Sequence, residues 1–303
     1  MKEKNLNDFT DGDDAETPMV SVVMIAYNSA PYINEAIAGV VKQHCDFTIR
    51  LVICDDASTD STGEICEKWR QQYPDIIDYH RNEHNLGVQG NYLEALRHCT
   101  GKYIAMCDAD DYWFDRRKLA RQVAYMEKHP ECTLTYHRVV NYYESTGEMS
   151  LSNGGGAIEN SAEGLASRNV ITNLSVLYRA SAVDQPYLPS WLSEVRLFDY
   201  GLHMLVASRG EIKYMSRPMG VYRHLPTAIW SEAEQSRRLE MAISVRKHLI
   251  TELASRPELT VRLQKACDDM LANASRPINP ASRRRVLTRI RAFVSRLLPV
   301  PKP

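Results

Sequence analysis

The sequence lacks the segments that would place the chain in a membrane or in an oxidising compartment. It has no run of about 18 apolar residues, the length that a transmembrane helix needs. Residues 1–17 are polar and acidic without an apolar stretch, so we expect disorder there and no signal peptide. The seven Cys residues include no CxxC pair, which excludes the usual zinc spacings and is typical of small core residues in a reducing compartment. We therefore expect a cytoplasmic protein.

Two glycine-rich motifs that bind nucleotides in other α/β proteins are also missing. No GxGxxG follows the first predicted strand, which excludes the dinucleotide-dehydrogenase class. No GxxxxGK[ST] is present, which excludes the P-loop class. The formal net charge is −1, and we expect no nucleic-acid partner. Residues 281–303 depart from this balance, because they carry Arg and Lys but no acidic residue.

Strand and helix patterns alternate through residues 20–130. The runs "VSVVMIA", "IRLVIC", "IIDYH" and "KYIAMC" are of strand type, and a helical pattern follows each of them. Four βα units predict an α/β fold with a mostly parallel central sheet, flanked by helices and joined by right-handed crossovers. In the second half we expect strands at 132–143, at 169–178 and at "EIKYM", a helix after Asp199, and helix throughout 231–275.

Polar residues stand where three of the predicted strands end. They are Tyr27 and Asn28 after the first strand, Asp55 and Asp56 after the second, and Asp108, Asp110 and Asp111 after the fourth. The carboxyl ends of parallel strands share one edge of the sheet, where ligands bind. Like charges this close raise one another's pKa unless a cation lies between them.

Oxygen-only ligands of this kind suit a hard divalent cation, Mg²⁺ or Mn²⁺. Such a cation takes one or two protein carboxylates and fills its other positions with phosphate and water. The pattern therefore predicts a nucleotide diphosphate bound through a metal, with the Tyr27 ring available to stack on a base. Helix capping is the plainer alternative. It suits Asn28 or Ser29, and also Asp199, but one cap needs only one carboxylate and so does not account for Asp108, Asp110 and Asp111 together.

These segments resemble the inverting family 2 glycosyltransferases, which have a GT-A fold. The resemblance rests on "VSVVMIAYN", "LVICDDASTDST", "NLGVQGN" and "GKYIAMCDADDYW" followed by "KLARQVAYMEKHP", in the family's order over residues 20–130. It implies a metal-dependent hexosyltransferase-type enzyme that uses a nucleotide-diphosphate sugar, usually a UDP-sugar. The acceptor would be a hydroxyl of a glycan or of a lipid-linked molecule, in cell-surface polysaccharide biosynthesis.

The resemblance also implies roles for individual residues. Those that would bind the nucleotide-sugar are Tyr27, Asn28, Asp55, Asp56 and Asp108. Asp110, alone or with Asp111, would bind Mn²⁺ or Mg²⁺. The segment "RLFDYGLHMLVA" is similar to the one that carries the family's catalytic base, which nominates Asp199, although Phe198 stands where the family often has Glu. The segment "GVYRHLPTAIW" nominates Tyr222 and Arg223 for the acceptor region and His224 for the metal.

We expect three parts along the chain. They are a disordered acidic N-terminus at 1–17, a GT-A domain at 18–230 and a helical C-terminal extension at 231–303. Within the domain, the nucleotide-sugar half would span 18–130 and the acceptor half 131–230. Residues 282–298 place apolar residues on one helical face and arginines opposite, the pattern of a helix lying on the cytoplasmic face of an anionic membrane. A helix docked on the domain with a solvated basic face is the alternative.

Two other functions compete with glycosyl transfer. A non-catalytic nucleotide-sugar-binding protein of the same fold would keep the same strand ends. A sugar nucleotidyltransferase would normally show a glycine-rich basic motif after its first strand, where this chain has "AYNSAPY". Release of nucleotide from a sugar donor in the presence of Mn²⁺ separates an enzyme from a binding protein.

Overall fold

The computed structural model describes residues 18–152, 161–183, 188–226 and 235–274. Its strands are β1 (Val20–Ala26), β2 (Ile49–Asp55), β3 (Ile77–Arg81), β4 (Tyr103–Met106), β5 (Tyr112–Trp113), β6 (Cys132–Tyr143), β7 (Glu148–Leu151), β8 (Leu177–Arg179) and β9 (Glu211–His224). Its α-helices are α1 (Ile33–Val41), α2 (Thr62–Gln72), α3 (Gly87–Arg97), α4 (Lys118–Lys128), α5 (Ala162–Ser167), α6 (Phe198–Ala207), α8 (Gln235–Glu252) and α9 (Pro257–Ala274). Short 3₁₀ helices include η2 (Asn173–Ser175), η3 (Ala180–Ala182) and η5 (Ser190–Ser193).

One central sheet joins the two halves of the chain. Its strands follow the order β3-β2-β1-β4-β8-β6-β9-β5, and β7 pairs with β6. The first four strands are parallel, as predicted, with Val20 of β1 opposite Ile49 of β2 on one side and Tyr103 of β4 on the other. Beyond β4 the sheet is mixed, because β8 is antiparallel to both β4 and β6 while β9 is parallel to β6. The predicted α/β fold with a flanked central sheet is confirmed.

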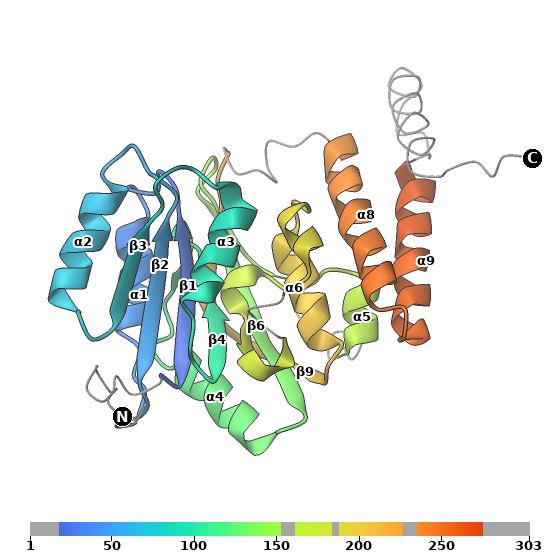
Figure 1. Cartoon of the computed structure of the whole chain (residues 1–303), viewed down its shortest axis with the longest axis horizontal. Coiled ribbons are helices and arrows are strands. Elements are labelled where there is room, and N and C mark those ends of the chain that lie inside the picture. Colours follow the sequence, from blue (N-terminus) through green and yellow to red (C-terminus); the bar gives the residue numbers. More distant parts are fainter. Residues whose placement is uncertain (1–17, 153–160, 184–187, 227–234, 275–303) are drawn as a thin grey trace, which may run out of the picture.

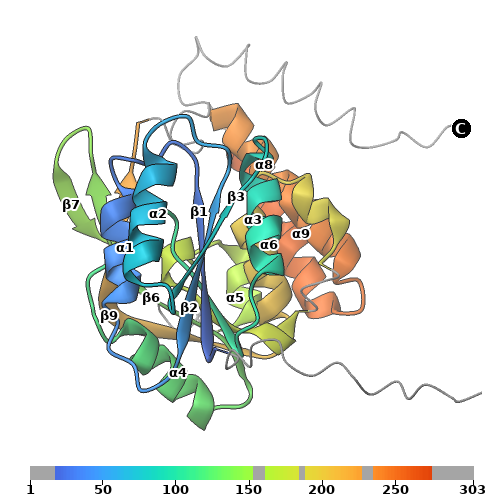
Figure 2. The ribbon, with the colours of Figure 1, turned by 60° about the vertical axis from the view of Figure 1, so that its left-hand side comes forward.

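The helices cover both faces of the sheet and enclose two separate cores (Figure 1). Side chains alternate along β1: Val22 and Met24 pack in the core that contains residues of α1, α2 and α4, whereas Val23 packs in the core of α3, α6, α8 and α9. Both faces of the strand are therefore buried, which explains its unbroken apolar sequence. The β6–β7 hairpin projects from this body in the second view (Figure 2).

The second half is less regular than the sequence predicted. The strand expected at 169–178 is wrong over most of its length, since η2 occupies Asn173–Ser175 and β8 begins at Leu177. The strand expected at "EIKYM" is only the start of the longer β9. Helix throughout 231–275 is also wrong, because α8 ends at Glu252 and α9 begins at Pro257, a residue that suits a first helical turn but cannot continue a helix.

The membrane prediction at 282–298 lies outside the described residues. Within the part of the chain that the structure describes, no helix is both long enough and apolar enough to cross a membrane. The helical C-terminal extension itself is confirmed in α8 and α9, which pack against α6 and α5.

Helix α1 lies unusually close to β5, the strand that follows the acidic segment 108–111. A Cβ atom added to Gly39 of α1 would lie 2.7 Å from the backbone oxygen of Trp113 and 2.9 Å from its backbone nitrogen. Because backbone atoms cannot move aside as a flexible side chain can, this position needs glycine for the close approach of the two elements.

Gly39→Ala should therefore lower the free energy of unfolding by about 1–3 kcal/mol, the usual cost of overpacking. The clash outweighs the gain of about 1 kcal/mol that alanine has over glycine inside a helix. Urea unfolding measures the change. Gly147→Asn is the control, because an added Cβ there meets nothing within 4 Å and asparagine tolerates its φ of 71°. Equal stability of Gly39→Ala and wild type would contradict the tight contact.

Candidate active site

The end of β1 is tied to the turn after β2 by Asn28. Asn28 has a φ of 49°, and Ala57 in the facing turn has a φ of 58°, so both adopt the left-handed conformation. The Asn28 Oδ1 accepts a hydrogen bond from the backbone N–H of Thr59 at 2.8 Å, and its own N–H donates to Ser58 Oγ at 2.9 Å. Asn28 therefore links two strand ends. It does not cap α1, whose N-cap is Tyr32 without a side-chain hydrogen bond.

Tyr27, one residue earlier, presents its side chain to solvent. It is 52% exposed, although it directly follows a strand in which six of seven residues are buried. A free aromatic face at this edge can stack on a planar ring.

Asp55 is buried and satisfied by protein groups. Its Oδ1 accepts from the backbone N–H of Ser58 at 2.8 Å, and its Oδ2 accepts from the Tyr79 hydroxyl at 3.0 Å and from Arg81 at 2.9 Å. These contacts occupy three of about four acceptor positions of the carboxylate. Asp55 thus fixes the turn that carries Asp56.

Asp56 holds the loop that begins α3. It is 2% exposed, and its carboxylate accepts from Asn82 Nδ2 at 2.9 Å and from the backbone N–H groups of Leu86 at 2.7 Å and Gly87 at 2.9 Å. These contacts occupy three of about four acceptor positions of the carboxylate, as at Asp55. The carboxylate also lies at the N-terminus of α3, where a negative charge is stabilised by the helix dipole.

Asp108 is held by two side chains that lie far away in the sequence. The Tyr92 hydroxyl donates to Asp108 Oδ1, and Asn173 Nδ2 donates to Asp108 Oδ2 at 3.0 Å. Asn173 also donates to the Tyr92 hydroxyl at 2.7 Å. Burial raises the pKa of Asp108, and these two hydrogen bonds oppose the rise.

Asp110 is the least satisfied of the three neighbouring carboxylates. Among the described residues, its carboxylate accepts only from its own backbone N–H. Burial, followed by the charge of Asp108, raises its pKa to about 6, and Arg223 only partly offsets this rise. Asp111 is fully buried and accepts from the backbone N–H of Arg223 at 2.9 Å; burial and its acidic neighbours raise its pKa as well.

Arg223 contacts the acidic segment 108–111 through its backbone and its side chain. Its guanidinium is buried, donates to the backbone oxygen of Asp110, pairs with Glu35 of α1, and lies 4.6 Å from the centre of the Tyr112 ring. The sequence nominated Arg223 for the acceptor region. Its contacts hold the segment that carries Asp110.

Asp199 lies in the first turn of α6, close enough to Asp108 to feel its charge. Its pKa is raised to about 6 by burial and then by the negative charge of Asp108, while the backbone N–H of Tyr200 opposes the rise. The N-cap of α6 is Leu197, so the capping alternative for Asp199 is wrong. The fold therefore brings residue 199 to the edge where β4 ends.

Tyr222 stands among the same carboxylates, and the His224 ring packs edge-on against the Tyr222 ring with 4.6 Å between the centroids. Burial raises the pKa of Tyr222, and the charges of Asp111, Asp110, Asp199 and Asp108 add to this rise. The His224 ring stacks on Tyr143 at 4.3 Å, and its Nε2 lies 3.2 Å from Asn141 Oδ1. In the described ranges, no three His, Cys, Asp or Glu side chains are grouped as a metal site.

The sequence did not identify Tyr92, Asn173 and Arg81. Tyr92 directly follows "NLGVQGN", so its position beside a motif was a usable signal. Asn173 lies 65 residues from Asp108, in a segment predicted as strand, and no local pattern marks it.

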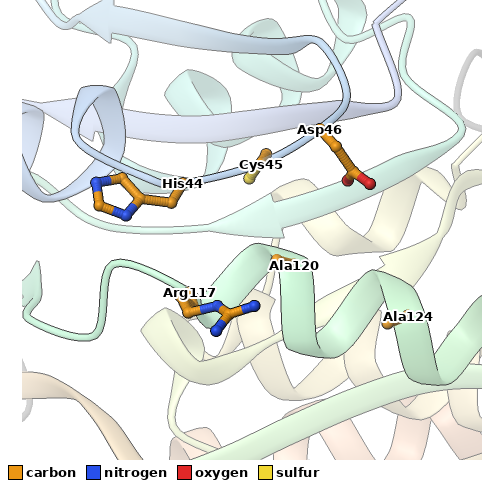
Figure 3. A pocket seen from close by; sticks show the side chains of 6 residues that line it. All are labelled: His44, Cys45, Asp46, Arg117, Ala120 and Ala124. Atoms are coloured by element: carbon orange, nitrogen blue, oxygen red, sulfur yellow. The ribbon is translucent and has the colours of Figure 1, made fainter.

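A separate depression lies at the opposite edge, where the chain enters β2. It has a volume of about 550 Å³, and Figure 3 shows the residues that line it: His44, Cys45, Asp46, Arg117, Ala120 and Ala124. It lies away from the carboxyl ends of the parallel strands, where sheets of this type bind ligands. We therefore assign the site to the edge that carries Asp56, Asp108 and Asp199.

This chain is similar to known proteins in sequence and in fold. A model of the family described as "Glycosyl transferase family 2" matches residues 21–183. An uncharacterized protein of Mycobacterium tuberculosis is 36% identical over 220 residues, which are 72% of this chain and 62% of that protein. The Escherichia coli protein WfaP, named UDP-Glc:alpha-D-GlcNAc-diphosphoundecaprenol beta-1,3-glucosyltransferase, is 34% identical over 109 residues, 36% of this chain and 41% of its own length. This chain thus spans less than two thirds of these relatives.

Solved structures share the fold at lower identity. Staphylococcus aureus TarS 1-349 in complex with UDP-GlcNAc has a TM-score of 0.63 and 20% identity, covering 83% of this chain and 71% of TarS 1-349. The Pyrobaculum calidifontis mannosyltransferase PcManGT, in complex with GDP-Man and Mn²⁺, has a TM-score of 0.59 and 19% identity, covering 93% and 82%.

The raised pKa of Asp110 predicts a pH-dependent loss of stability in EDTA. A carboxyl whose folded pKa is about 6 stabilises the fold fully below about pH 4, and this contribution is lost as the pH rises to about 6. Between pH 4 and pH 7 the wild type should therefore lose on the order of 1–3 kcal/mol more unfolding free energy than Asp110→Asn. Urea unfolding at both pH values measures the difference. Parallel pH profiles would contradict it.

Proposed function

Because the chain belongs to glycosyl transferase family 2, we propose that it transfers a sugar, with inversion, from a nucleotide-diphosphate donor to an acceptor hydroxyl. The donor is a UDP-sugar and the acceptor a glycan or a lipid-linked molecule of cell-surface polysaccharide biosynthesis. The observation that carries this proposal is the meeting of Asp108, Asp110 and Asp199 at one sheet edge. These residues come from two halves of the chain that are far apart in sequence.

The proposed donor site uses the ends of β1 and β2. Tyr27 offers an exposed ring for the base, and Asp56 keeps one acceptor position for a base or ribose donor. Asn28 and Asp55 support this surface through their contacts with the turn at 57–59. The names of TarS and PcManGT, whose structures hold UDP-GlcNAc and GDP-Man, support a nucleotide-sugar ligand for this fold.

The chemistry of the acidic group fits a divalent cation. Among the described residues, the Asp110 carboxylate has no hydrogen-bond partner beyond its own N–H, and burial and then the charge of Asp108 raise its pKa. Asp110 would hold Mn²⁺ or Mg²⁺, with Asp111 as a second candidate. A bound cation of this kind would neutralise charge on the departing diphosphate. The Mn²⁺ in the PcManGT complex supports divalent metal use in this fold.

Asp199 is suited to be the general base. A carboxylate with a pKa near 6 is ionised at neutral pH, yet it is more basic than an ordinary aspartate. In this role it accepts the proton of the acceptor hydroxyl as the oxygen attacks the anomeric carbon. Tyr222 stays protonated among the acids and can donate a hydrogen bond to substrate oxygens.

The proposed acceptor is a glycan or a lipid-linked molecule. The printed name of WfaP includes a GlcNAc-diphosphoundecaprenol acceptor, which supports a lipid-linked molecule as one choice. Residues 131–230 form the proposed acceptor half. Contact with the cytoplasmic face of a membrane through 282–298 remains a proposal, since these residues lie outside the described ranges.

Asp199→Asn should lower the turnover number by about 10² to 10⁴, because the amide cannot accept the proton. Donor affinity should stay the same, since Asp199 is not placed on the donor. Initial rates of nucleotide release and calorimetry with the same donor measure the two quantities. Wild-type turnover in Asp199→Asn would remove this residue from the mechanism.

Asp110→Ala should weaken Mn²⁺-dependent binding of UDP by about tenfold or more, because the cation loses its main protein ligand. Isothermal titration with UDP, in Mn²⁺ and in EDTA, measures the effect. Asp46→Ala is the matched control, since that acid lies at the opposite edge of the sheet. Equal losses in both variants, or no loss in either, would contradict a metal-binding role for Asp110.

A further inference from the structure

Two stacked aromatic rings join the helix that faces Asp108 to the helix that carries Asp199. The rings of Tyr92 in α3 and Phe198 in α6 have centroids 5.0 Å apart and an interplanar angle of 2°. Both side chains are buried, at 5% and 2% exposed. A buried parallel pair of this kind fixes the distance between two helices more tightly than aliphatic contacts do, because flat rings pack in few ways.

Each ring is attached to a different part of the proposed site. The Tyr92 hydroxyl donates to Asp108, so the position of the Tyr92 side chain is coupled to the donor carboxylate. Phe198 is the residue before Asp199, and both lie in the first turn of α6. A shift of the Phe198 ring would therefore move the backbone that carries the proposed base.

Helix α3 is itself fixed to the nucleotide end of the site. The backbone N–H groups of Leu86 and Gly87, at its start, both donate to Asp56. Tyr92 follows one and a half turns later on a helix that packs on β1 and β2. Helix α3 is thus a rigid support that touches Asp56 at its start, Asp108 through a hydroxyl and Phe198 through a ring.

We infer that Tyr92 and Phe198 are positioning residues of the transfer reaction. The Tyr92 hydroxyl orients the donor carboxylate, and the Tyr92–Phe198 stack sets the position of the base relative to it. This inference rests on the proposed function. It predicts one effect for the hydroxyl of Tyr92 and a different effect for its ring. A misplacement of a base by about 1 Å is enough to lower a rate by about 10²-fold.

Two conservative variants separate the hydroxyl from the ring. Phe198→Leu removes the stack and leaves the Asp108 hydrogen bond, so kcat should fall about tenfold or more while the donor KM stays within about twofold. Tyr92→Phe keeps both rings and removes the hydroxyl, so the donor KM should rise about fivefold or more with a smaller change in kcat. The probe is UDP release in Mn²⁺ from UDP-glucose or UDP-GlcNAc, whichever the wild type turns over faster.

Three further single variants and one double variant test whether the loss of kcat comes from the stack. Val206→Ala truncates another buried residue of α6 and should leave kcat unchanged, which separates positioning from general loss of stability. Phe198→Tyr keeps a ring at the same position and should restore most of kcat. Tyr92→Leu breaks the stack from the other side and also removes the hydroxyl, and its combination with Phe198→Leu should lower kcat no further than Tyr92→Leu alone, since the shared contact is already lost.

The outcomes distinguish this inference from the function on which it rests. A kcat loss in Phe198→Leu, with restoration in Phe198→Tyr and no additivity in the double variant, supports it. An active wild type with an unchanged kcat in Phe198→Leu and Tyr92→Leu would overturn the inference alone, as would an equal kcat loss in Val206→Ala. A wild type that releases no UDP from either donor would overturn the proposed function, and the inference with it.

Discussion

Mutual repulsion among four carboxylates is the constraint on which the rest of this site depends. Asp108, Asp110, Asp111 and Asp199 are brought to one edge of a sheet and partly or fully withdrawn from water. Burial alone already disfavours the charged forms, and each neighbouring charge adds to that cost. The surrounding residues hold these groups in place without neutralising them. The cation of the proposed function would relieve this repulsion.

The protein groups that hold the acids divide into local and distant sets. Asp55 and Asp56 are satisfied mainly by backbone and side-chain donors of neighbouring loops, and they shape the edge that the proposed function assigns to the nucleotide. Asp108 and Asp111 depend on Asn173 and Arg223, which the chain delivers only after it has completed the parallel half of the sheet. The first half of the chain therefore supplies three of the four acids and Tyr92, and the second half supplies Asp199 together with Asn173 and Arg223.

This division explains what could be predicted from the sequence. The buried strands, the acids at their ends and the likeness to a family of transferases are local patterns, and each was readable within 20–130. The fold of that region and the family were confirmed. The contacts of Asn173 with Asp108 and of Arg223 with Glu35 were not readable, because they join residues 65 and 188 positions apart. The exchange of an expected Glu for Phe198 was visible, but its stacking partner in α3 was not.

The left-handed conformations of Asn28 and Ala57 have a consequence for how this chain can change over evolutionary time. Backbone strain of this kind costs on the order of 1–3 kcal/mol at Ala57 and less at Asn28, because asparagine tolerates the left-handed conformation, and it persists only where the surrounding structure imposes it. A lineage released from the need to bind its ligand would gain stability by relaxing these two turns first. If related chains keep residues at positions 28 and 57 that favour the left-handed conformation, selection has acted on the activity and not only on the fold.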